Sequence, residues 1–331
     1  MINGSVHLVS QHLEVKGLMQ EEDGSHSAVH RSIPLFDLER LAVSESITVS
    51  GPALAALMRA EIPLVIIGRG QPQILGSMLP AGPAHAQWRI TQYECCRDFS
   101  LSFPLAQNII AAKIFNQRRT LQRLSLSREE DVCQTLRLLS DALLATGRTI
   151  SIAELLGVEG NASAQWYQSW ASFLPPQFPF ERRTRRPPQN PVNAVLSFTS
   201  ALLYHEMAAT LHACGLDAGL GIIHVTENGR WSLALDLMEP FRPLIIEPLA
   251  LDVFSRGILR AEHFHPAQGG IYLHAEGRKK LILQYEKRME REFLSEHRGH
   301  RTTLRAQIQQ DAADYKSQLE RPLAYNPFRM N

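Results

Sequence analysis

The chain has 331 residues, of which 44% are hydrophobic and 20% are charged, and its 34 basic and 33 acidic side chains give a formal charge of +1. This length and composition exclude an intrinsically disordered chain and predict about two domains with a substantial buried core. A net charge so close to zero does not by itself indicate a nucleic-acid partner, so any basic binding surface must come from local clusters.

The sequence shows no sign of export or of membrane insertion. Its N-terminus lacks a basic segment followed by an apolar one, and no run of about 18 apolar residues occurs. The four cysteines are too widely spaced for a CxxC metal site, and the adjacent Cys95 and Cys96 are unfavourable for disulfide geometry. We therefore expect reduced cysteines and a cytoplasmic protein.

The first eighty residues have the pattern of a small, mostly β domain. Apolar and polar side chains alternate over residues 6–9, and short apolar runs at 47–49 and 63–67 are typical of strands. A short helix is expected over residues 52–60. Pro80, Gly82 and Pro83 then interrupt the apolar pattern, which indicates a linker.

Beyond the linker, apolar residues recur at helical spacing. Helical stretches are expected at residues 92–124, 129–146, 152–172, 191–214 and 278–319. The predicted fold class is therefore α+β, with a β-rich N-terminal dimerisation domain at 1–80, a linker at 81–91, and a larger, all-α catalytic domain at 92–331. Neither a GxxxxGKS/T nor a GxGxxG phosphate loop is present, so nucleotide hydrolysis has no support in the sequence.

The first of three local patterns with chemical meaning is a glutamate between two glycines. Gly157 and Gly160 flank Glu159 in an otherwise apolar helical stretch. Because each glycine costs about 1 kcal/mol relative to alanine in a helix interior, the pair suggests that something approaches closely. The alternative is a structural turn or a helix start, with Glu159 near the positive end of the helix dipole.

The second pattern is a glycine-rich loop that leads to a histidine. The loop contains Gly215, Gly219 and Gly221, and two apolar residues then lead to His224. Such a loop can place an imidazole at the end of a buried segment, where it acts as a metal ligand or as a base. The alternative is a core histidine whose hydrogen bonds are satisfied.

The third pattern contains two acids three residues apart, Asp236 and Glu239, in an apolar stretch. If this stretch begins a helix, the two side chains share one face and both carboxylates point into one site. Burying both carboxylates is costly without a cation. The alternative is that one acid caps the helix while the other pairs with Arg242.

Together, the three patterns supply carboxylates and one imidazole. A mixed oxygen and nitrogen donor set suits Mg²⁺ or Mn²⁺ better than a thiolate-binding metal. Such an ion polarises a phosphodiester and lowers the pKa of an attacking water or sugar hydroxyl. The sequence thus predicts metal-dependent phosphoryl transfer.

Two arginine clusters are candidates for contacts with DNA phosphates. The first cluster comprises Arg182, Arg183, Arg185 and Arg186, and the second comprises Arg118, Arg119 and Arg123. Basic side chains that neutralise phosphates provide the part of DNA binding that does not depend on sequence. The alternative for each cluster is an ordinary solvated surface.

The three patterns, in this order and after a small β domain, resemble the family of CRISPR-associated integrases, the universal adaptation endonucleases of CRISPR systems. The resemblance covers nearly the whole chain. The segments that carry it are 157–160, 202–206, 221–224, 235–243, 269–273 and 277–289, together with 62–65 in the β domain and 116–119 in the first long helix.

The resemblance places Glu159, His224 and Glu239 at the family's three metal-ligand positions. The third position carries aspartate in some members and glutamate in others, so the longer side chain of Glu239 could shift the ion. Asp236 matches a second acid of the same motif and is expected to assist in catalysis. Whether His224 binds the ion or shuttles a proton stays open at this point.

The activity that the resemblance implies is insertion of short foreign DNA, the spacers, into a CRISPR array. In this reaction the 3′-hydroxyl of a short duplex attacks a phosphodiester at the edge of a CRISPR repeat. The implied cofactor is Mg²⁺ or Mn²⁺. The implied partners are double-stranded DNA as spacer precursor and CRISPR repeat, a second copy of the chain in a homodimer, and a small companion CRISPR adaptation protein that joins a higher-order complex.

Two other functions fit the same residues. A transposon-borne relative of this integrase would insert the ends of a mobile element, but such relatives usually carry an extra C-terminal DNA-binding module, for which the last residues leave no room. An inactive DNA-binding scaffold would not need three competent ligand positions. The CRISPR role is therefore the expected one. Tyr204 and Glu206, on an expected helix near the site, are expected to pack and to hydrogen-bond rather than to act in catalysis.

Overall fold

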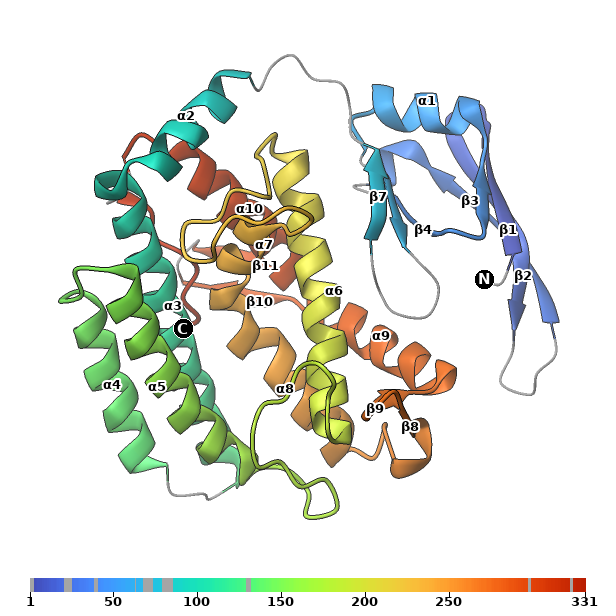
Figure 1. Ribbon diagram of the computed structural model, residues 1–331. Coiled ribbons are helices and arrows are strands. Elements are labelled where there is room, and N and C mark those ends of the chain that lie inside the picture. The colour runs from blue at the N-terminus through green and yellow to red at the C-terminus, as the bar shows by residue number, and fades with distance from the viewer. Residues whose placement is uncertain are drawn as a thin grey trace. The chain divides into compact units, whose positions relative to one another are not determined.

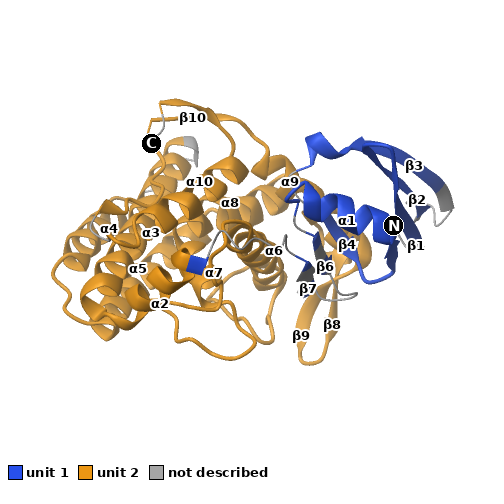
Figure 2. Cartoon of the chain, turned by 90° about the horizontal axis from the view of Figure 1, so that it is seen from above, with its two compact units in different colours: residues 1–86 blue, residues 87–331 orange. Residues whose placement is uncertain are grey.

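The computed structural model describes most of the chain (Figure 1). The described residues are 3–20, 26–38, 41–62, 64–67, 74–78, 86–128, 132–296, 299–321 and 324–331. The chain divides into two compact units, Met1–Ala86 and Gln87–Asn331 (Figure 2). Residues 86–91 of the expected linker are helical instead, because no proline or glycine follows Pro83 in that segment, and residues 81–85 lie outside the described part.

The N-terminal unit consists of two sheets and a helix. Its strands are β1 (Asn3–Val9), β2 (His12–Gln20), β3 (His26–Pro34), β4 (Leu41–Ser44), β5 (Ile47–Val49), β6 (Leu64–Ile67) and β7 (Ile74–Met78), and its helices are η1 (Leu35–Asp37) and α1 (Gly51–Arg59). One sheet has the order β3-β2-β1-β5, and the other has the order β4-β6-β7. The strands and the helix expected in this region are confirmed by these elements.

The sequence pattern accounts for this unit. Val6 and Leu13, on adjacent antiparallel strands, point into a small core that α1 completes with Leu57. The helix begins where the side chain of Ser50 accepts a hydrogen bond from the backbone N–H of Ala53. The unit therefore has a hydrophobic core of its own, separate from the large core of the C-terminal unit.

The C-terminal unit is mainly helical. Its helices are α2 (Ala86–Arg97), α3 (Phe99–Arg128), α4 (Cys133–Thr146), α5 (Ile152–Ala171), α6 (Pro191–Ala213), α7 (Ser232–Leu237), η3 (Glu239–Phe241), α8 (Arg242–Ser255), η4 (Ala261–His263), α9 (Ala275–Met289) and α10 (Leu304–Ser317). Its strands form two hairpins, β8 (Phe264–Ala267) with β9 (Gly270–Leu273) and β10 (Phe293–Ser295) with β11 (His300–Thr302). The α+β class is thus confirmed, and the two hairpins are small exceptions to an all-α second domain.

Helix α3 organises the large core. It packs against α4 and α5 on one side and against η3 and α8 on the other. Trp166 and Trp170, one turn apart on α5, stack at 6.0 Å and are fully buried. Because α3 lies between α5 and η3, residues far apart in the sequence come together along its length.

The expected helix at 278–319 is wrong in its middle part. Helix α9 ends at Met289, and the β10–β11 hairpin separates it from α10. Gly299 adopts a left-handed φ of 71° next to the start of β11, and Thr303 caps α10 by accepting from the N–H of Ala306 at 3.1 Å. Among the described helices, none is both long enough and apolar enough to cross a membrane.

Candidate active site

Glu159 lies in the middle of α5 rather than at a turn or a helix start. Its Oε1 accepts hydrogen bonds from Ser163 Oγ, one turn further along the helix, at 2.6 Å and from Lys113 Nζ on α3 at 2.5 Å. A Cβ atom added at Gly157 or Gly160 would meet nothing within 4 Å. Packing within the chain therefore does not require the two glycines. Their effect is to leave the helix surface beside Glu159 without side chains.

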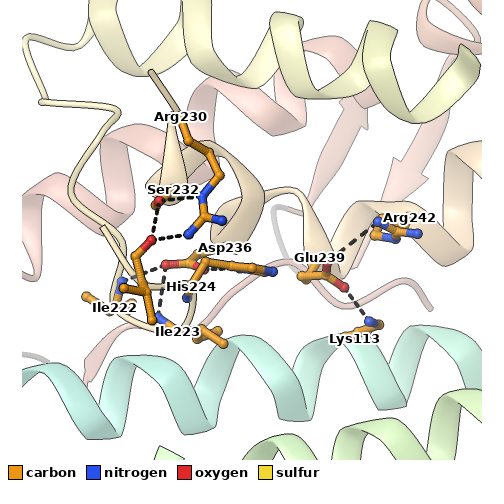
Figure 3. A network of polar contacts seen from close by, with 10 residues as sticks. Lys113, Ile222, Ile223, His224, Arg230, Ser232, Asp236, Glu239 and Arg242 are labelled. Carbon is orange, nitrogen blue, oxygen red and sulfur yellow. Dashed lines mark hydrogen bonds and ion pairs between the residues drawn. The ribbon is translucent and has the colours of Figure 1, made fainter. Parts of the chain in front are cut away.

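Lys113 is the site residue that the sequence did not predict. Its ammonium group donates a hydrogen bond to Oε1 of Glu159 and forms an ion pair with Oε2 of Glu239. Figure 3 shows the contact with Glu239. The side chains of all three residues are mostly buried, with 10% of Lys113, 18% of Glu159 and 10% of Glu239 exposed. We call them the carboxylate–lysine cluster. The available signal was a lone lysine in the apolar run at residues 109–115 of α3.

The electrostatics of the cluster keep Lys113 and Glu239 charged. Burial alone would raise the pKa of Glu239, but Lys113 and Arg242 lower that pKa to about 2. Burial would likewise lower the pKa of Lys113, yet the charges of Glu239 and Glu159 outweigh this effect and raise it. Nη1 of Arg242 lies 3.7 Å from Oε1 of Glu239. Two carboxylates are therefore balanced by two cationic side chains.

Helix α3 also fixes the turn that carries Glu239. Two further side chains of α3 donate to backbone carbonyls just after this residue. Asn116 Nδ2 bonds the carbonyl oxygen of Pro240 at 2.8 Å, and Thr120 Oγ1 bonds that of Pro243 at 3.0 Å. Because these donors are buried, the position of Glu239 depends on the same helix that supplies its lysine partner.

Asp236 points away from the carboxylate–lysine cluster. Its fully buried carboxylate accepts hydrogen bonds from the backbone N–H groups of Ile222 at 2.6 Å, Ile223 at 3.0 Å and His224 at 3.0 Å. It also bonds Nδ1 of the His224 ring at 2.6 Å (Figure 3). Helix α7 ends between Asp236 and Glu239, so the two acids do not share one face. The expectation that both carboxylates point into one site is wrong.

Gly221 is a position where the chain requires glycine. A Cβ atom there would lie 2.2 Å from the carbonyl oxygen of His224, 2.7 Å from Cβ of Ser232 and 3.2 Å from Oδ2 of Asp236. This close approach lets consecutive backbone N–H groups reach one buried carboxylate. The hydroxyl of Ser232 closes the segment by donating to the carbonyl of Val225 at 2.8 Å. We call residues 221–225 the His224 loop.

The His224 side chain is 35% exposed, so it is not a fully packed core histidine. Its Nδ1 is engaged by Asp236, which leaves Nε2 as the nitrogen that can meet a ligand or a proton. In Figure 3 the ring lies between Asp236 and Glu239, and its charged form contributes to the lowered pKa of Glu239. The imidazole therefore lies beside the carboxylate–lysine cluster, with a defined orientation.

The donor atoms of the cluster and of His224 determine which metal ion they suit. No three histidine, cysteine or acidic side chains of the described residues lie in position to hold one together. The carboxylates of Glu159 and Glu239 nevertheless converge on a single cation, the Lys113 ammonium. Two carboxylates with a neighbouring imidazole match the preferences of Mg²⁺ and Mn²⁺. The residues present therefore fit a divalent cation.

The structure separates the arginines of the first cluster. Arg183 is half-buried and donates from Nη1 to Asn193 Oδ1 and Ser197 Oγ of α6, both at 3.1 Å. Burial lowers the pKa of Arg183 to about 10. Its neighbours Arg182, Arg185 and Arg186 are exposed.

The second cluster lies on α3. Arg118 and Arg119 are half-buried, and Nε of Arg118 donates to Ser140 Oγ of α4 at 2.8 Å. Arg123 is exposed and donates to the carbonyl of Asn331 at 2.8 Å. Part of this cluster therefore holds helices and chain segments together.

Tyr204 and Glu206 of α6 have structural contacts, as expected. The hydroxyl of Tyr204 accepts from the backbone N–H of Trp231 at 2.8 Å, which fixes the start of α7. The carboxylate of Glu206 accepts from Tyr285 Oη and from Arg305 Nε, both at 2.7 Å. These bonds connect α6 to α9 and α10, so the expectation of packing and hydrogen bonding is confirmed.

Comparison with known proteins gives a consistent result. The family model described as CRISPR associated protein Cas1 matches residues 4–287. A Cas4/Cas1 fusion, an exonuclease and endonuclease from Rhodospirillum rubrum, is 33% identical over 288 residues, which are 85% of this chain but 50% of the fusion. The chain thus spans about half the length of such fusions. A CRISPR-associated endonuclease Cas1 from Thermus thermophilus is 30% identical over 316 residues, 94% of this chain and 93% of that protein.

Solved structures agree with this comparison. A chain of a partial Cas6-RT-Cas1–Cas2 complex is 25% identical, with a TM-score of 0.74 over 99% of this chain and 96% of that one. A casposase bound to its integration product has a TM-score of 0.80 at 21% identity, covering 99% and 92%. A Cas1 protein from Thermotoga maritima has a TM-score of 0.75 at 22% identity, covering 96% and 95%. At these identities the last two show the fold alone.

Proposed function

Because this chain belongs to the CRISPR-associated Cas1 family, whose relatives are named endonucleases, we propose that it is a metal-dependent DNA endonuclease and integrase. In this proposal it inserts short foreign DNA into a CRISPR array by attack of a 3′-hydroxyl on a phosphodiester at the repeat edge. The observation that supports it most directly is the convergence of Glu159 and Glu239 on one cation position beside His224.

Glu159, Glu239 and His224 would hold the ion, which we propose to be Mg²⁺ or Mn²⁺. Bound there, it would supply positive charge to the phosphate oxygens and make the attacking hydroxyl more acidic. The two carboxylates reach the position from α5 and η3, and α3 holds both elements in place. The chain thus brings two oxygen donors to one position before any substrate arrives.

His224 would act through its Nε2 atom. Asp236 accepts at Nδ1 and so fixes both the tautomer and the direction of the ring. In this arrangement Asp236 is a positioning residue, and it contacts neither the ion nor the DNA. The histidine then either completes the donor set or carries a proton between the reacting oxygen and solvent, for which its partial exposure is suited.

DNA contacts are proposed for exposed arginines. Arg182, Arg185 and Arg186 are free of the in-chain role that Arg183 has, and they are the first candidates to neutralise phosphates. Arg118 and Arg119 are weaker candidates because they are half-buried on α3. The proposed duplexes are the spacer precursor and the CRISPR repeat.

The proposed protein partners are a second copy of this chain and a small companion CRISPR adaptation protein. Support for the companion comes from the solved complex that contains Cas1 together with Cas2. The β-rich N-terminal unit, with its own core, is the proposed dimerisation region. The proposed place of action is the cytoplasm, where the CRISPR array lies.

The test is strand transfer of a labelled short duplex into a plasmid that carries the cognate repeat, with Mg²⁺ or Mn²⁺ and with the companion protein. Glu159→Gln, Glu239→Gln and His224→Ala should each lower joining by at least about 100-fold, because each removes a donor from the ion. Glu154→Gln is the matched control, since Glu154 lies in the first turn of the same helix, α5, and is exposed.

The outcomes separate the candidate functions. Joining that survives all three substitutions would show that the active site lies elsewhere. Equal joining into a plasmid without the repeat would favour a transposon-type integrase, a role for which the casposase structure shows only the shared fold. Duplex binding without any joining under either metal would favour a DNA-binding scaffold.

A further inference from the structure

The position toward which the two proposed ligand carboxylates converge is taken by a side chain of this protein. Lys113 Nζ lies 2.5 Å from Oε1 of Glu159 and pairs with Oε2 of Glu239 (Figure 3). The lysine side chain is 10% exposed, and the elements that carry its partners pack on either side of α3. The ammonium therefore bridges two carboxylates that would otherwise repel each other in a half-buried site.

We propose that Lys113 is an internal counter-cation, which holds Glu159 and Glu239 together in the metal-free protein and must leave when a divalent ion binds. The inference rests on the proposed metal site and adds that Lys113 competes with the metal ion for the two carboxylates. Its consequence is that the affinity for the metal is set by an exchange of cations as well as by the ligands.

The charge balance favours this exchange. In the metal-free site the negative charges of Glu159 and Glu239 are balanced by Lys113 and Arg242. A divalent ion that entered with both cationic side chains still in place would leave two uncompensated positive charges among side chains that are mostly buried. Release of Lys113 removes one of these charges and opens the shared position.

The structure indicates which of the two cations moves. Arg242 is anchored at the start of α8, where it also interacts with Tyr167 and Glu247, which are hydrogen-bonded to each other at 2.7 Å. Lys113 has a flexible four-carbon stem, and its ammonium lies between the two carboxylates. In the proposed exchange, rotation about that stem frees the site.

The experiment is a titration of the full-length protein with Mn²⁺, in which free Mn²⁺ is measured by electron paramagnetic resonance. Lys113→Met should bind Mn²⁺ at least about tenfold more tightly than the unmodified protein, because the competing charge is gone. Glu159→Gln should lose the site. Lys280→Met is the matched control, since Lys280 pairs with Glu276 at 2.6 Å on α9, and it should bind like the unmodified protein.

Two results would overturn the proposal and are distinguishable. Equal or weaker binding in Lys113→Met, with binding lost in Glu159→Gln, would mean that the metal site is right but that Lys113 does not compete for it. Unchanged binding in Glu159→Gln would mean that the proposed metal site is wrong, and the proposed exchange of cations would then be wrong as well.

A measurement on the unmodified protein covers the case in which Lys113→Met does not fold. An amine-reactive acetylating reagent should label Lys113 slowly without metal, because its ammonium is buried and ion-paired. Saturating Mn²⁺ should raise the labelling of Lys113 at least about fivefold, as a released lysine is exposed, while Lys280 is labelled equally in both states. Labelling of Lys113 that does not change with Mn²⁺ would contradict the proposal.

Discussion

The carboxylate–lysine cluster and the His224 loop lie next to each other but are built in different ways. The cluster joins residues that are distant in the sequence, since Lys113 and Glu159 are 46 positions apart, and its members are held by the packing of α3, α5 and η3. The loop is local, since His224 and Asp236 are 12 positions apart and share backbone and side-chain hydrogen bonds.

This difference separates two requirements of the proposed metal site. The cluster contains mutually balanced charges, so a new cation can rearrange it. The loop makes four hydrogen bonds to the single buried carboxylate of Asp236, so its geometry is fixed in advance. We infer that the histidine is positioned before the metal arrives, whereas the carboxylates reach their final arrangement only with it.

Gly221→Ala should have the largest effect, because the new Cβ would lie 2.2 Å from a backbone oxygen of the loop. The loop must then move away from Asp236, and we expect a loss of about 3 kcal/mol in the free energy of unfolding. Urea denaturation measures it. A loss below about 0.5 kcal/mol would mean that the loop adapts and is not fixed in advance.

Asp236→Asn should have the second largest effect. An amide can accept through one oxygen only, and its NH₂ group would face backbone N–H donors of the loop. We expect a loss of about 2 kcal/mol in the free energy of unfolding and faster hydrogen exchange at Ile222, Ile223 and His224. Exchange in α5 around Glu159 should stay unchanged. If hydrogen exchange became equally faster in the His224 loop and in α5, the two regions would not be held independently of each other.

The basic segment outside both regions should affect DNA binding rather than folding. Replacing Arg182, Arg185 and Arg186 together by glutamine should lower the slope of log affinity against log salt by about 2 to 3, as three phosphate contacts are lost. Fluorescence anisotropy with a short duplex at several salt concentrations measures it. Arg183→Gln is the contrasting variant, and it should cost about 1 to 3 kcal/mol of stability through its bonds to α6. An unchanged slope in the triple variant would remove these arginines from the contact surface.

Gly157→Ala should have the smallest effect and the opposite sign. The added Cβ meets nothing within 4 Å, and alanine favours the helix, so the free energy of unfolding should rise by about 0.5 to 1 kcal/mol. Thermal unfolding measures this change. The Gly157→Ala variant also serves as the control for Gly221→Ala. A loss of stability would mean that α5 has a packing demand at this position that the structure does not show.

The sequence predicted the site better where its pattern was local. The glycines before His224 indicated a tight loop, and Gly221 is indeed the residue that a Cβ would block. The helices around Glu159 and Tyr204 were predicted from apolar spacing, because buried faces leave a clear period in the sequence. The ion pair between Glu239 and Arg242 was one of the alternatives that spacing alone left open.

Contacts between distant segments could not be predicted in this way. Lys113 is a single charge in an apolar run, and only the packing of α3 between α5 and η3 gives it two acidic partners. Spacing placed Asp236 and Glu239 on one helical face, but the helix ends between them and the two side chains separate. The hairpin at Phe293–Thr302 was missed because its strands are short and its neighbours are helical.

In the proposed site, Glu159 and Glu239 share one divalent ion at the position now taken by the Lys113 ammonium. The most direct measurement is a crystal structure of the protein with Mn²⁺, with the anomalous signal used to locate the metal. We predict a single peak about 2.1 Å from one oxygen of each carboxylate, with Nε2 of His224 directed at it and Lys113 turned away. A peak held by other residues, or no peak in this site at saturating Mn²⁺, would contradict the proposed metal site.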